Sequence, residues 1–433
     1  MRKTGRFSLL FSVVFLLANI AAAETLSEDR TTRIEETLPV RSGILGGITK
    51  FELTNPELPY RKGFKADPFL LHAAFTAQEQ WDSNIFLTED DEKEDFITKL
   101  SPSIGIELPI QEHKLSADYR MDAYFFARYD REDYIDHTIR GLAALDFTNF
   151  KVNVSEMYRR FSDRSGSEDT MRIRQQHNYL RAGVASAFDQ LSYDIGYTFG
   201  IEDYLNDEII AGPLTYDDKD RKLHIIDVTL SYRFAPKTFF LVESDLGFYR
   251  YNSRYSSDSW YTEDLVGLKG ELTDKVTING RAGLRYQKYD SSDYVVDKDF
   301  FSFVCKGGVE FKASKDDVFT LNVERSIYES TYQDINYYNV NFVSLSYTHW
   351  FNDKVSANLY GDYQYNWYPE ETTEGTETAR RYDHIFGGGG GLRYDVREWL
   401  SLETMYEYKQ RDSKFDTFDF KDHIITVKGT VGF

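Results

Sequence analysis

Strict alternation of apolar and polar residues is the feature that most limits how this chain can fold. From Val355 to Trp367 every odd position is apolar, aromatic or glycine, and the even positions are polar or Tyr360. Successive side chains of a β-strand point to opposite faces, so this segment predicts a strand with one apolar and one wet surface. The same pattern recurs in the segments 191–199, 240–248 and 276–286.

Short and long connections alternate between these segments. Short turns are predicted at 110–113, 149–150, 188–190, 235–237, 273–275, 314–317, 351–354 and 395–397. Longer polar loops are predicted at 89–94, 162–169, 202–221, 252–259, 289–298, 368–379 and 411–418. Turns at one rim and loops at the other are typical of outer-membrane barrels. We therefore expect an all-β, transmembrane, antiparallel up-and-down barrel of about 18 strands, or about 16 if a weak hairpin is overcounted.

Composition alone leaves a secreted soluble β-protein and a transmembrane barrel open. The mean hydropathy is -0.52 and 28% of residues are charged, but a barrel strand shows lipid only its alternate residues. The aromatic content of 16% favours the barrel, since Tyr and Trp prefer membrane–water interfaces. Only 9 prolines occur, as expected where most residues lie in hydrogen-bonded strands.

The N-terminus has the three parts of a secretory signal. Arg2, Lys3 and Arg6 precede an apolar run from residue 7 to 20, and small residues follow at 21–23. The run is shorter than the roughly 20 residues that a spanning helix needs. We therefore predict a signal peptide over 1–23, cleaved before Glu24.

Residues 24–66 do not alternate, and prolines interrupt them. They are predicted to form either a periplasmic extension or a segment folded into the lumen, ahead of a barrel domain over 67–433. Residues 427–433 alternate again and end in Phe433, which resembles the C-terminal strand signal of outer-membrane barrels. That resemblance implies recognition by the barrel-assembly machinery, an outer-membrane location among lipid, and both termini in the periplasm.

Inward residues of so large a barrel cannot fill it, so an aqueous channel or a plugged lumen is expected. The alternation predicts that the lumen is lined by Asp118, Arg120, Asp122, Glu243, Asp245, Arg281, Arg285, Glu324, Tyr360, Asp362 and Lys428. These charges would either orient water and admit polar solutes, or only pair with each other and solvate the wall. Inward tyrosines such as Tyr249 and Tyr360 could stack on sugars.

Two features along the strands allow more than one interpretation. The run Gly387–Gly391 would leave room for the N-terminal segment or for cargo, or would bend the wall at a barrel corner. The single cysteine, Cys305, excludes an intrachain disulfide and a cysteine-based metal cluster, and its position predicts that it faces lipid.

Other functional classes find no support in the sequence. The net charge of -20 and the lack of a basic patch disfavour nucleic-acid binding. The 8 histidines form no metal-spaced pair, and no G-x-S-x-G elbow occurs, so we expect no enzyme, no cofactor and no metal. The acidic segments 89–92 and 217–220 lack the spacing of a calcium loop and are expected to be solvated.

The segment from Gln80 to Leu87 contains Asp82, Asn84, Ile85 and Phe86. It resembles the opening motif of the putative β-barrel porin 2 family. Residues 95–102, which read D-F-I-T-K-L-S-P, and residues 134–137 are similar to later elements of that family. The resemblance implies an outer-membrane barrel with a porin-like or exopolysaccharide-secretion role and no catalytic residues.

Together these observations predict a non-enzymatic pore for polar solutes or carbohydrate, with a surface polysaccharide and its export partners as candidate cargo and partners. A closed barrel that scaffolds a polysaccharide-assembly complex is the second hypothesis, and a barrel hydrolase is the third. An apolar outer face suits lipid and a subunit interface equally, so the sequence favours no oligomeric state.

Overall fold

The computed structural model describes residues 63–162, 168, 172–205, 209–211, 214–293, 299–333 and 335–433. The predicted signal peptide and nearly all of the predicted 24–66 segment lie outside these residues. Within the described part no helix is long and apolar enough to cross a membrane.

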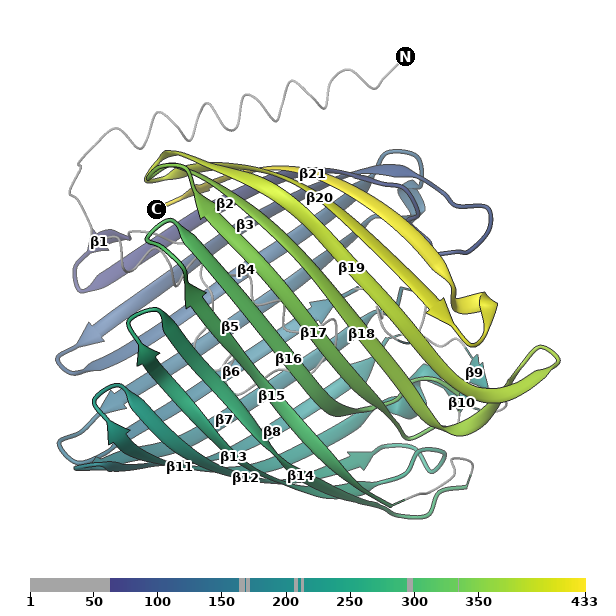
Figure 1. Ribbon diagram of the computed structural model, residues 1–433, viewed down its shortest axis with the longest axis horizontal. Helices are drawn as coiled ribbons and strands as arrows, with labels where there is room; N and C mark the ends of the chain where they lie inside the picture. The colour runs from purple at the N-terminus through teal and green to yellow at the C-terminus, as the bar shows by residue number, and fades with distance from the viewer. Residues whose placement is uncertain are drawn as a thin grey trace. The chain divides into compact units, whose positions relative to one another are not determined.

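Eighteen antiparallel strands close into a ring, as predicted (Figure 1). Each strand pairs with its neighbour along the chain, and β2 pairs with β21 to complete the ring. The strands of the ring are β2 (Phe69–Asp82), β3 (Asp95–Ile110), β4 (His113–Phe126), β5 (Tyr134–Asp146), β6 (Lys151–Phe161), β7 (Gln175–Phe188), β8 (Leu191–Tyr204), β11 (Arg221–Ala235), β12 (Thr238–Tyr251), β13 (Ser259–Thr273), β14 (Val276–Tyr289), β15 (Phe300–Lys312), β16 (Asp317–Glu329), β17 (Tyr337–Trp350), β18 (Val355–Glu374), β19 (Glu377–Arg397), β20 (Leu400–Ser413) and β21 (Phe420–Gly432).

Small elements decorate the ring. The short strand β1 adds to β2, and a separate two-stranded sheet of β9 and β10 lies between β8 and β11. Three 3-10 turns occur in the described parts of the connections. The bounds of these elements are β1 (Phe64–Ala66), β9 (Ile209–Ala211), β10 (Leu214–Thr215), η1 (Asp130–Glu132), η2 (Tyr216–Lys219) and η3 (Asp416–Phe418).

The two rims differ as the sequence predicted. We name the rim at which every connection has two to four residues, such as 111–112 and 351–354, the turn rim, and the opposite one the loop rim. One predicted loop is wrong: residues 368–379 belong mostly to β18 and β19, which continue as a ladder to Glu374 and Glu377. This stretch extends beyond the apolar part of the wall, where both faces of a strand are polar and alternation no longer marks it.

The outer face of the ring is apolar at alternate positions. Leu359, Val427 and Ile104 are among its exposed large side chains. Cys305 shares its parity on β15 with the exposed Phe301 and Phe303, and therefore lies on this outer face, as predicted. A closed ring with such a surface leaves no unpaired edge strand and suits a lipid environment.

The family-like motif joins the two ends of the barrel domain at the loop rim. The side-chain amide of Asn84, which is fully buried, donates to the carbonyl oxygens of Thr88 at 2.7 Å and Lys421 at 3.0 Å. Its backbone N–H donates to the carboxylate of Asp82 at 3.0 Å. Ile85 is buried beside it, and the Phe86 ring packs edge-on against Tyr129. The motif thus holds the seam between β2 and β21.

The turn-rim end of the same seam is held by Phe433. Its backbone N–H donates to the carbonyl of Ala73 at 2.9 Å, and its carbonyl accepts from the Ala73 N–H at 3.3 Å. Its ring lies 5.5 Å from the Phe64 ring and 6.2 Å from the Trp399 ring, measured between centroids. The predicted role of Phe433 in barrel assembly stays a prediction, but its place in the seam is clear.

Candidate functional site: the lumen wall

The residues predicted to line the lumen all lie opposite in parity to the exposed apolar residues of their strands. On β4 the exposed Leu115 is odd-numbered, so Asp118, Arg120 and Asp122 face inward. The same comparison with Val242, Leu284, Leu321, Leu359 and Val427 places the remaining predicted residues on the inner face of β12, β14, β16, β18 and β21. Whether they contact a passing solute remains a prediction.

On β3 and β4 the inward charges pair with each other. The Asp122 carboxylate lies 2.9 Å from Arg120 Nη2 and 3.3 Å from Lys99 Nζ, and it also accepts from the Ser101 hydroxyl. Asp118 is the register partner of Arg140 on β5. Opposite charges that face each other across a strand pair stabilise the wall and leave it hydrated.

A second charged patch covers β11 to β16. Three carboxylates stand side by side in one row, because Asp245 is the register partner of both Asp227 and Glu263. Glu263 lies 3.7 Å from Arg285 Nη1 and 3.5 Å from Lys306 Nζ. One level nearer the turn rim, Arg281 Nε lies 2.9 Å from the Glu243 carboxylate, and Glu324 is the register partner of Lys306. On this side of the wall a row of three carboxylates is therefore followed by the basic groups of Arg285 and Lys306.

The glycine run on β19 accommodates side chains of the neighbouring strand. Tyr360 pairs in register with Gly389, and its hydroxyl donates across β19 to Glu407 at 2.8 Å. A Cβ on Gly387 would lie 2.5 Å from the Asp362 carboxylate. Among the described residues, Tyr360 and Asp362 take up the space beside Gly389 and Gly387. The predicted N-terminal segment lies outside the described residues, and room for it or for cargo at the glycine run stays a prediction.

Arg181 lies flat on the opposite part of the ring in the same way. Its guanidinium bonds to Asp227 at 3.0 and 2.8 Å and to Asp194 at 2.8 Å, and it is almost fully buried. It passes over two glycines, Gly183 and Gly196, whose missing side chains provide the space. Long side chains bound along the wall keep charge in the lumen without projecting far into it.

Several inward charges were missing from the sequence-based set. They are Lys99, Arg140, Arg181, Asp194, Asp227, Glu263, Lys306, Glu403 and Glu407. One of these missed residues, Glu403, is the partner of Lys428, a predicted lumen residue whose Nζ lies 2.7 Å from the Glu403 carboxylate. The alternation signal was present at each of these positions, and extending it to every strand would have found them.

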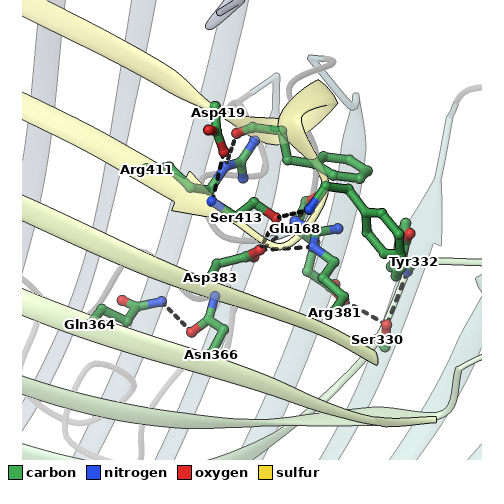
Figure 2. A network of polar contacts seen from close by, with 12 residues as sticks. Glu168, Ser330, Tyr332, Gln364, Asn366, Arg381, Asp383, Arg411, Ser413 and Asp419 are labelled. Atoms are coloured by element: carbon green, nitrogen blue, oxygen red, sulfur yellow. Dashed lines mark hydrogen bonds and ion pairs between the residues drawn. The ribbon is translucent and has the colours of Figure 1, made fainter. Parts of the chain in front are cut away.

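Loops fold inward at the loop rim around a buried ion pair (Figure 2). Arg381 donates from Nε and Nη2 to Asp383 at 3.0 and 2.9 Å, and both residues are 0% exposed. The guanidinium lies 3.8 Å from the Phe418 ring centroid, 4.5 Å from that of Tyr332 and 4.9 Å from that of Tyr368. Stacking and bidentate bonding offset the cost of dehydrating both charges.

Glu168 reaches this cluster from a distant part of the ring. It lies between β6 and β7, and eight strands separate it from the connection between β16 and β17. Its carboxylate accepts from the Ser330 hydroxyl at 2.6 Å and from the Thr331 N–H at 2.9 Å, and its carbonyl accepts from Arg381 at 2.7 Å. Burial raises the pKa of this carboxyl. The contact therefore extends across the loop-rim mouth to the opposite wall.

A further polar cluster lines the loop rim from β8 to β16. Arg221 lies 2.5 Å from Glu202 and donates to the Tyr251 hydroxyl at 3.0 Å. Tyr251 in turn donates to Glu329 at 2.9 Å, and Gln287 donates to the same carboxylate at 2.6 Å. Polar networks thus narrow the mouth on two sides.

Within the described residues no group of three or more His, Cys, Asp or Glu side chains could hold a metal ion. The acidic segment 217–220 instead serves the loop structure: Asp218 accepts from the Thr215 N–H at 2.8 Å and from the Ser253 hydroxyl at 2.5 Å. The expectation of no enzymatic activity stays a prediction.

The profile of a known family, described as putative beta-barrel porin 2, matches residues 59–433. The chain belongs to this family. Members of this family are outer-membrane, porin-like barrels, and the match extends the resemblance from residues 80–87, 95–102 and 134–137 to the whole ring. The chain has no significant match among curated proteins.

Solved outer-membrane proteins have similar backbone traces. OpdK from Pseudomonas aeruginosa is 10% identical with a TM-score of 0.49, covering 84% of this chain and 99% of its own. OccAB4 from Acinetobacter baumannii is 15% identical with a TM-score of 0.48, covering 87% and 99%. The FrpB iron transporter from Neisseria meningitidis is 9% identical with a TM-score of 0.46, covering 79% and 62%.

Proposed function

We propose that this member of the β-barrel porin 2 family is a non-enzymatic pore for polar solutes, with carbohydrate and a surface polysaccharide leaving the cell as the favoured cargo. The loop rim would face the exterior, and the turn rim and both chain ends the periplasm. The observation that carries the proposal is a lumen wall with acidic and basic side chains on every side. A ring of this size encloses more space than its inward side chains fill.

The arrangement of the wall supports a hydrated path. Tyr360 and Arg181 are bound flat along it, so their hydroxyl and guanidinium groups are present without blocking the interior. Inward tyrosine rings offer apolar faces to sugars, while nearby carboxylates such as Glu407 accept hydrogen bonds from hydroxyl groups. A carbohydrate chain can use both, because its sugar rings stack on tyrosine rings and its hydroxyl groups donate to carboxylates.

Single-channel recording in planar bilayers tests the pore. The full chain, folded into the bilayer, is expected to give stepwise conductance. Folded protein that gives no conductance, both intact and after deletion of residues 24–66, would overturn the open-pore proposal. Adding short neutral and anionic oligosaccharides from either side then identifies the cargo class, because a chain that enters the lumen interrupts the ion current.

Charge selectivity tests the wall directly. Replacing Glu243 with Gln leaves Arg281 without its partner, so the reversal potential in a salt gradient should shift toward anions. Glu156 lies on the outer face of β6 and bonds to Asn178 at 3.1 Å. Glu156→Gln removes the same charge outside the lumen and is the matched control, which should leave the reversal potential unchanged.

A closed scaffold barrel is the second candidate, and the contact of Glu168 with the opposite wall favours it. Such a barrel would dock periplasmic partners of a polysaccharide-assembly complex. Stable crosslinks to periplasmic proteins in cells, together with absence of conductance in the bilayer, would support the scaffold over the pore. Hydrolysis of lipid or peptide that is abolished by replacing one histidine would support the third hypothesis, a barrel hydrolase.

A further inference from the structure

Four histidines on the outer face share one arrangement with a tyrosine of an adjacent strand. In each pair the histidine Nδ1 lies within hydrogen-bond distance of the tyrosine hydroxyl, and the residue two positions after the histidine is the register partner of the tyrosine. The pairs are Tyr119–His137 at 2.9 Å, Tyr197–His224 at 2.7 Å, Tyr363–His384 at 2.7 Å and Tyr406–His423 at 2.9 Å.

All four pairs lie near the loop-rim edge of the apolar outer face, with Ile135 and Tyr382 one step farther out than His137 and His384. The register partners of the tyrosines, one step nearer the turn rim than the histidines, are large apolar residues that are 44–48% exposed. They are Ile139, Ile226, Phe386 and Ile425. Amphipathic rings at this level of a membrane protein typically mark the boundary between lipid tails and headgroups. The histidines are therefore positioned at headgroup level.

Two of the four pairs have an outward cation and an outward glutamine beside them. His137 stands in one row with Arg160 and Gln176 across β5, β6 and β7. The Tyr158 hydroxyl donates to the Gln176 side-chain oxygen at 3.2 Å, which leaves the Gln176 amide hydrogens pointing to other acceptors. We name His137, Arg160 and Gln176 the first headgroup site.

The Tyr406–His423 pair has the same three kinds of residue, a histidine, a cation and a glutamine, on β20 and β21. Lys421, two residues from His423 toward the loop rim, is the register partner of Gln410. The Tyr408 hydroxyl donates to the Gln410 side-chain oxygen at 2.8 Å. We name His423, Lys421 and Gln410 the second headgroup site. Within the described part of the chain neither Arg160 nor Lys421 forms an ion pair.

Each of the other two pairs has an acidic residue next to it or next to its outward cation. For the Tyr363–His384 pair, this residue is Asp412, the register partner of His384. For the Tyr197–His224 pair, it is Asp203. Asp203 interacts electrostatically with Lys222, which lies two residues from His224 toward the loop rim. Asp203 is also the register partner of Gln176, on the side away from Arg160. An open pocket of about 370 Å³ beside His384 is lined by tyrosine rings. These two pairs therefore lack an unopposed positive charge.

We propose that the first and second headgroup sites each bind the phosphate group of a lipid headgroup in the leaflet at the loop rim. In the tautomer in which the tyrosine hydroxyl donates to Nδ1, the ring hydrogen lies on Nε2, and the imidazole offers that N–H to a ligand at the membrane interface. The imidazole, the glutamine amide and the cation of each site can then all donate hydrogen bonds to one ligand that has only acceptor atoms. A phosphate group has only acceptor oxygens, and its hydrogen bond to Arg or Lys is charge-assisted.

Lipid titration by native mass spectrometry tests the proposal. The full chain, folded in a neutral detergent, is titrated with phosphatidic acid and, separately, with phosphatidylcholine of the same acyl chains. The variant Arg160→Gln/Lys421→Gln should lose about tenfold in affinity for phosphatidic acid, because one charge-assisted bond is lost at each site. Its affinity for phosphatidylcholine should not change. His137→Phe/His423→Phe should lose phosphatidic acid binding in the same direction.

Lys222→Gln is the matched control, since it removes an outward lysine beside a Tyr–His pair that has an acidic neighbour. It should bind phosphatidic acid like the wild type. An equal loss in Lys222→Gln, an unchanged affinity in Arg160→Gln/Lys421→Gln, or an equal loss of phosphatidylcholine would each overturn the two sites. The substituted residues lie on the outer face, where His137 is half-buried and the others are exposed, so the barrel should fold, which heat-dependent gel mobility verifies. The outcome is independent of whether the lumen conducts.

Discussion

The hydroxyl of Tyr360 reaches the carboxylate of Glu407 at 2.8 Å although a whole strand lies between them. Gly389 occupies the middle of that row, as register partner of Tyr360 on one side and Glu407 on the other. The ring can cross β19 because glycine has no side chain to meet it. A run of glycines in a long strand thus creates a contact between two strands that are not neighbours.

The crossing makes Gly389 sensitive to the smallest substitution. In Gly389→Ala the new methyl group would collide with the carbonyl of Tyr406 and lie 3.0 Å from the Tyr360 ring. We expect a loss of about 1–3 kcal/mol of unfolding free energy from overpacking, measured by urea unfolding in vesicles. Gly361→Ala on β18, where the nearest atom is 3.9 Å away, is the control and should stay near wild type. Equal effects of both variants would contradict the crossing.

The seam between β2 and β21 predicts a loss of stability when Asn84 is changed. Asn84→Ala removes two donated hydrogen bonds and leaves the partly buried carbonyl of Lys421 short of a partner. A buried polar group that loses its partner costs about 1–3 kcal/mol, so the urea midpoint should fall. Asn149 is exposed in the turn between β5 and β6, and Asn149→Ala should have no such effect. A normal midpoint in Asn84→Ala would argue against the seam contact.

The buried Arg381–Asp383 ion pair at the loop rim predicts a large loss of unfolding free energy that a second substitution partly restores. Arg381→Met leaves the carboxylate of Asp383 buried without its partner, which should cost about 3–5 kcal/mol of unfolding free energy. Removing the orphaned charge as well, in Arg381→Met/Asp383→Leu, should restore part of that loss. Urea unfolding of the two variants checks this, and a double variant that is less stable than the single one would contradict it.

Asp220 predicts a pH dependence at the loop rim. Burial, with the nearby Asp203, Asp217 and Asp218, raises the pKa of Asp220 from 3.8 to about 6, although the N–H of Tyr204 acts in the opposite direction. A raised pKa means that the folded state holds the proton more tightly. The stability that Asp220 contributes is therefore full below pH 3.8 and is lost as the pH rises toward 6.

Asp220→Asn cannot ionise, so its melting temperature relative to wild type should increase between pH 4 and pH 7. The comparison of the two proteins at each pH cancels the contribution of the other carboxylates. Asp419, which is also in a loop-rim connection and has a pKa raised by burial, gives a second variant of the same type. A difference between Asp220→Asn and wild type that stays constant with pH would contradict the shift.

Alternation predicted the ring well because lipid and lumen impose opposite chemistry on neighbouring residues. The pattern correctly placed Cys305 outside and located the turn rim to within a few residues. It failed at residues 368–379, where the hairpin leaves the apolar band and both faces become polar. Strand pairing there is decided by backbone hydrogen bonds, such as those of the Thr372 and Ala379 pair, which leave no trace in side-chain polarity.

Contacts across the ring were beyond sequence reasoning for a different reason. Glu168 and Ser330 are 162 residues apart, and nothing in either segment indicates that one reaches the other. The glycine run was recognised, but its purpose depended on which side chains of β18 stand beside it in register. The motif at Asn84 was recognised by family resemblance alone, and only its contact with Lys421 gives it a physical role.

The seam has a consequence for the order in which the barrel forms. Asn84 and its acceptor Lys421 are separated by 337 residues, so the bond can form only after every intervening strand exists. Hairpins between sequence neighbours close small loops and can form early, whereas joining β2 to β21 closes the largest loop of the ring and carries its highest entropic cost. Closure is therefore the last and slowest step expected for this barrel. Until it occurs, β2 has an unpaired edge, and the Asn84 amide lacks its acceptor at Lys421.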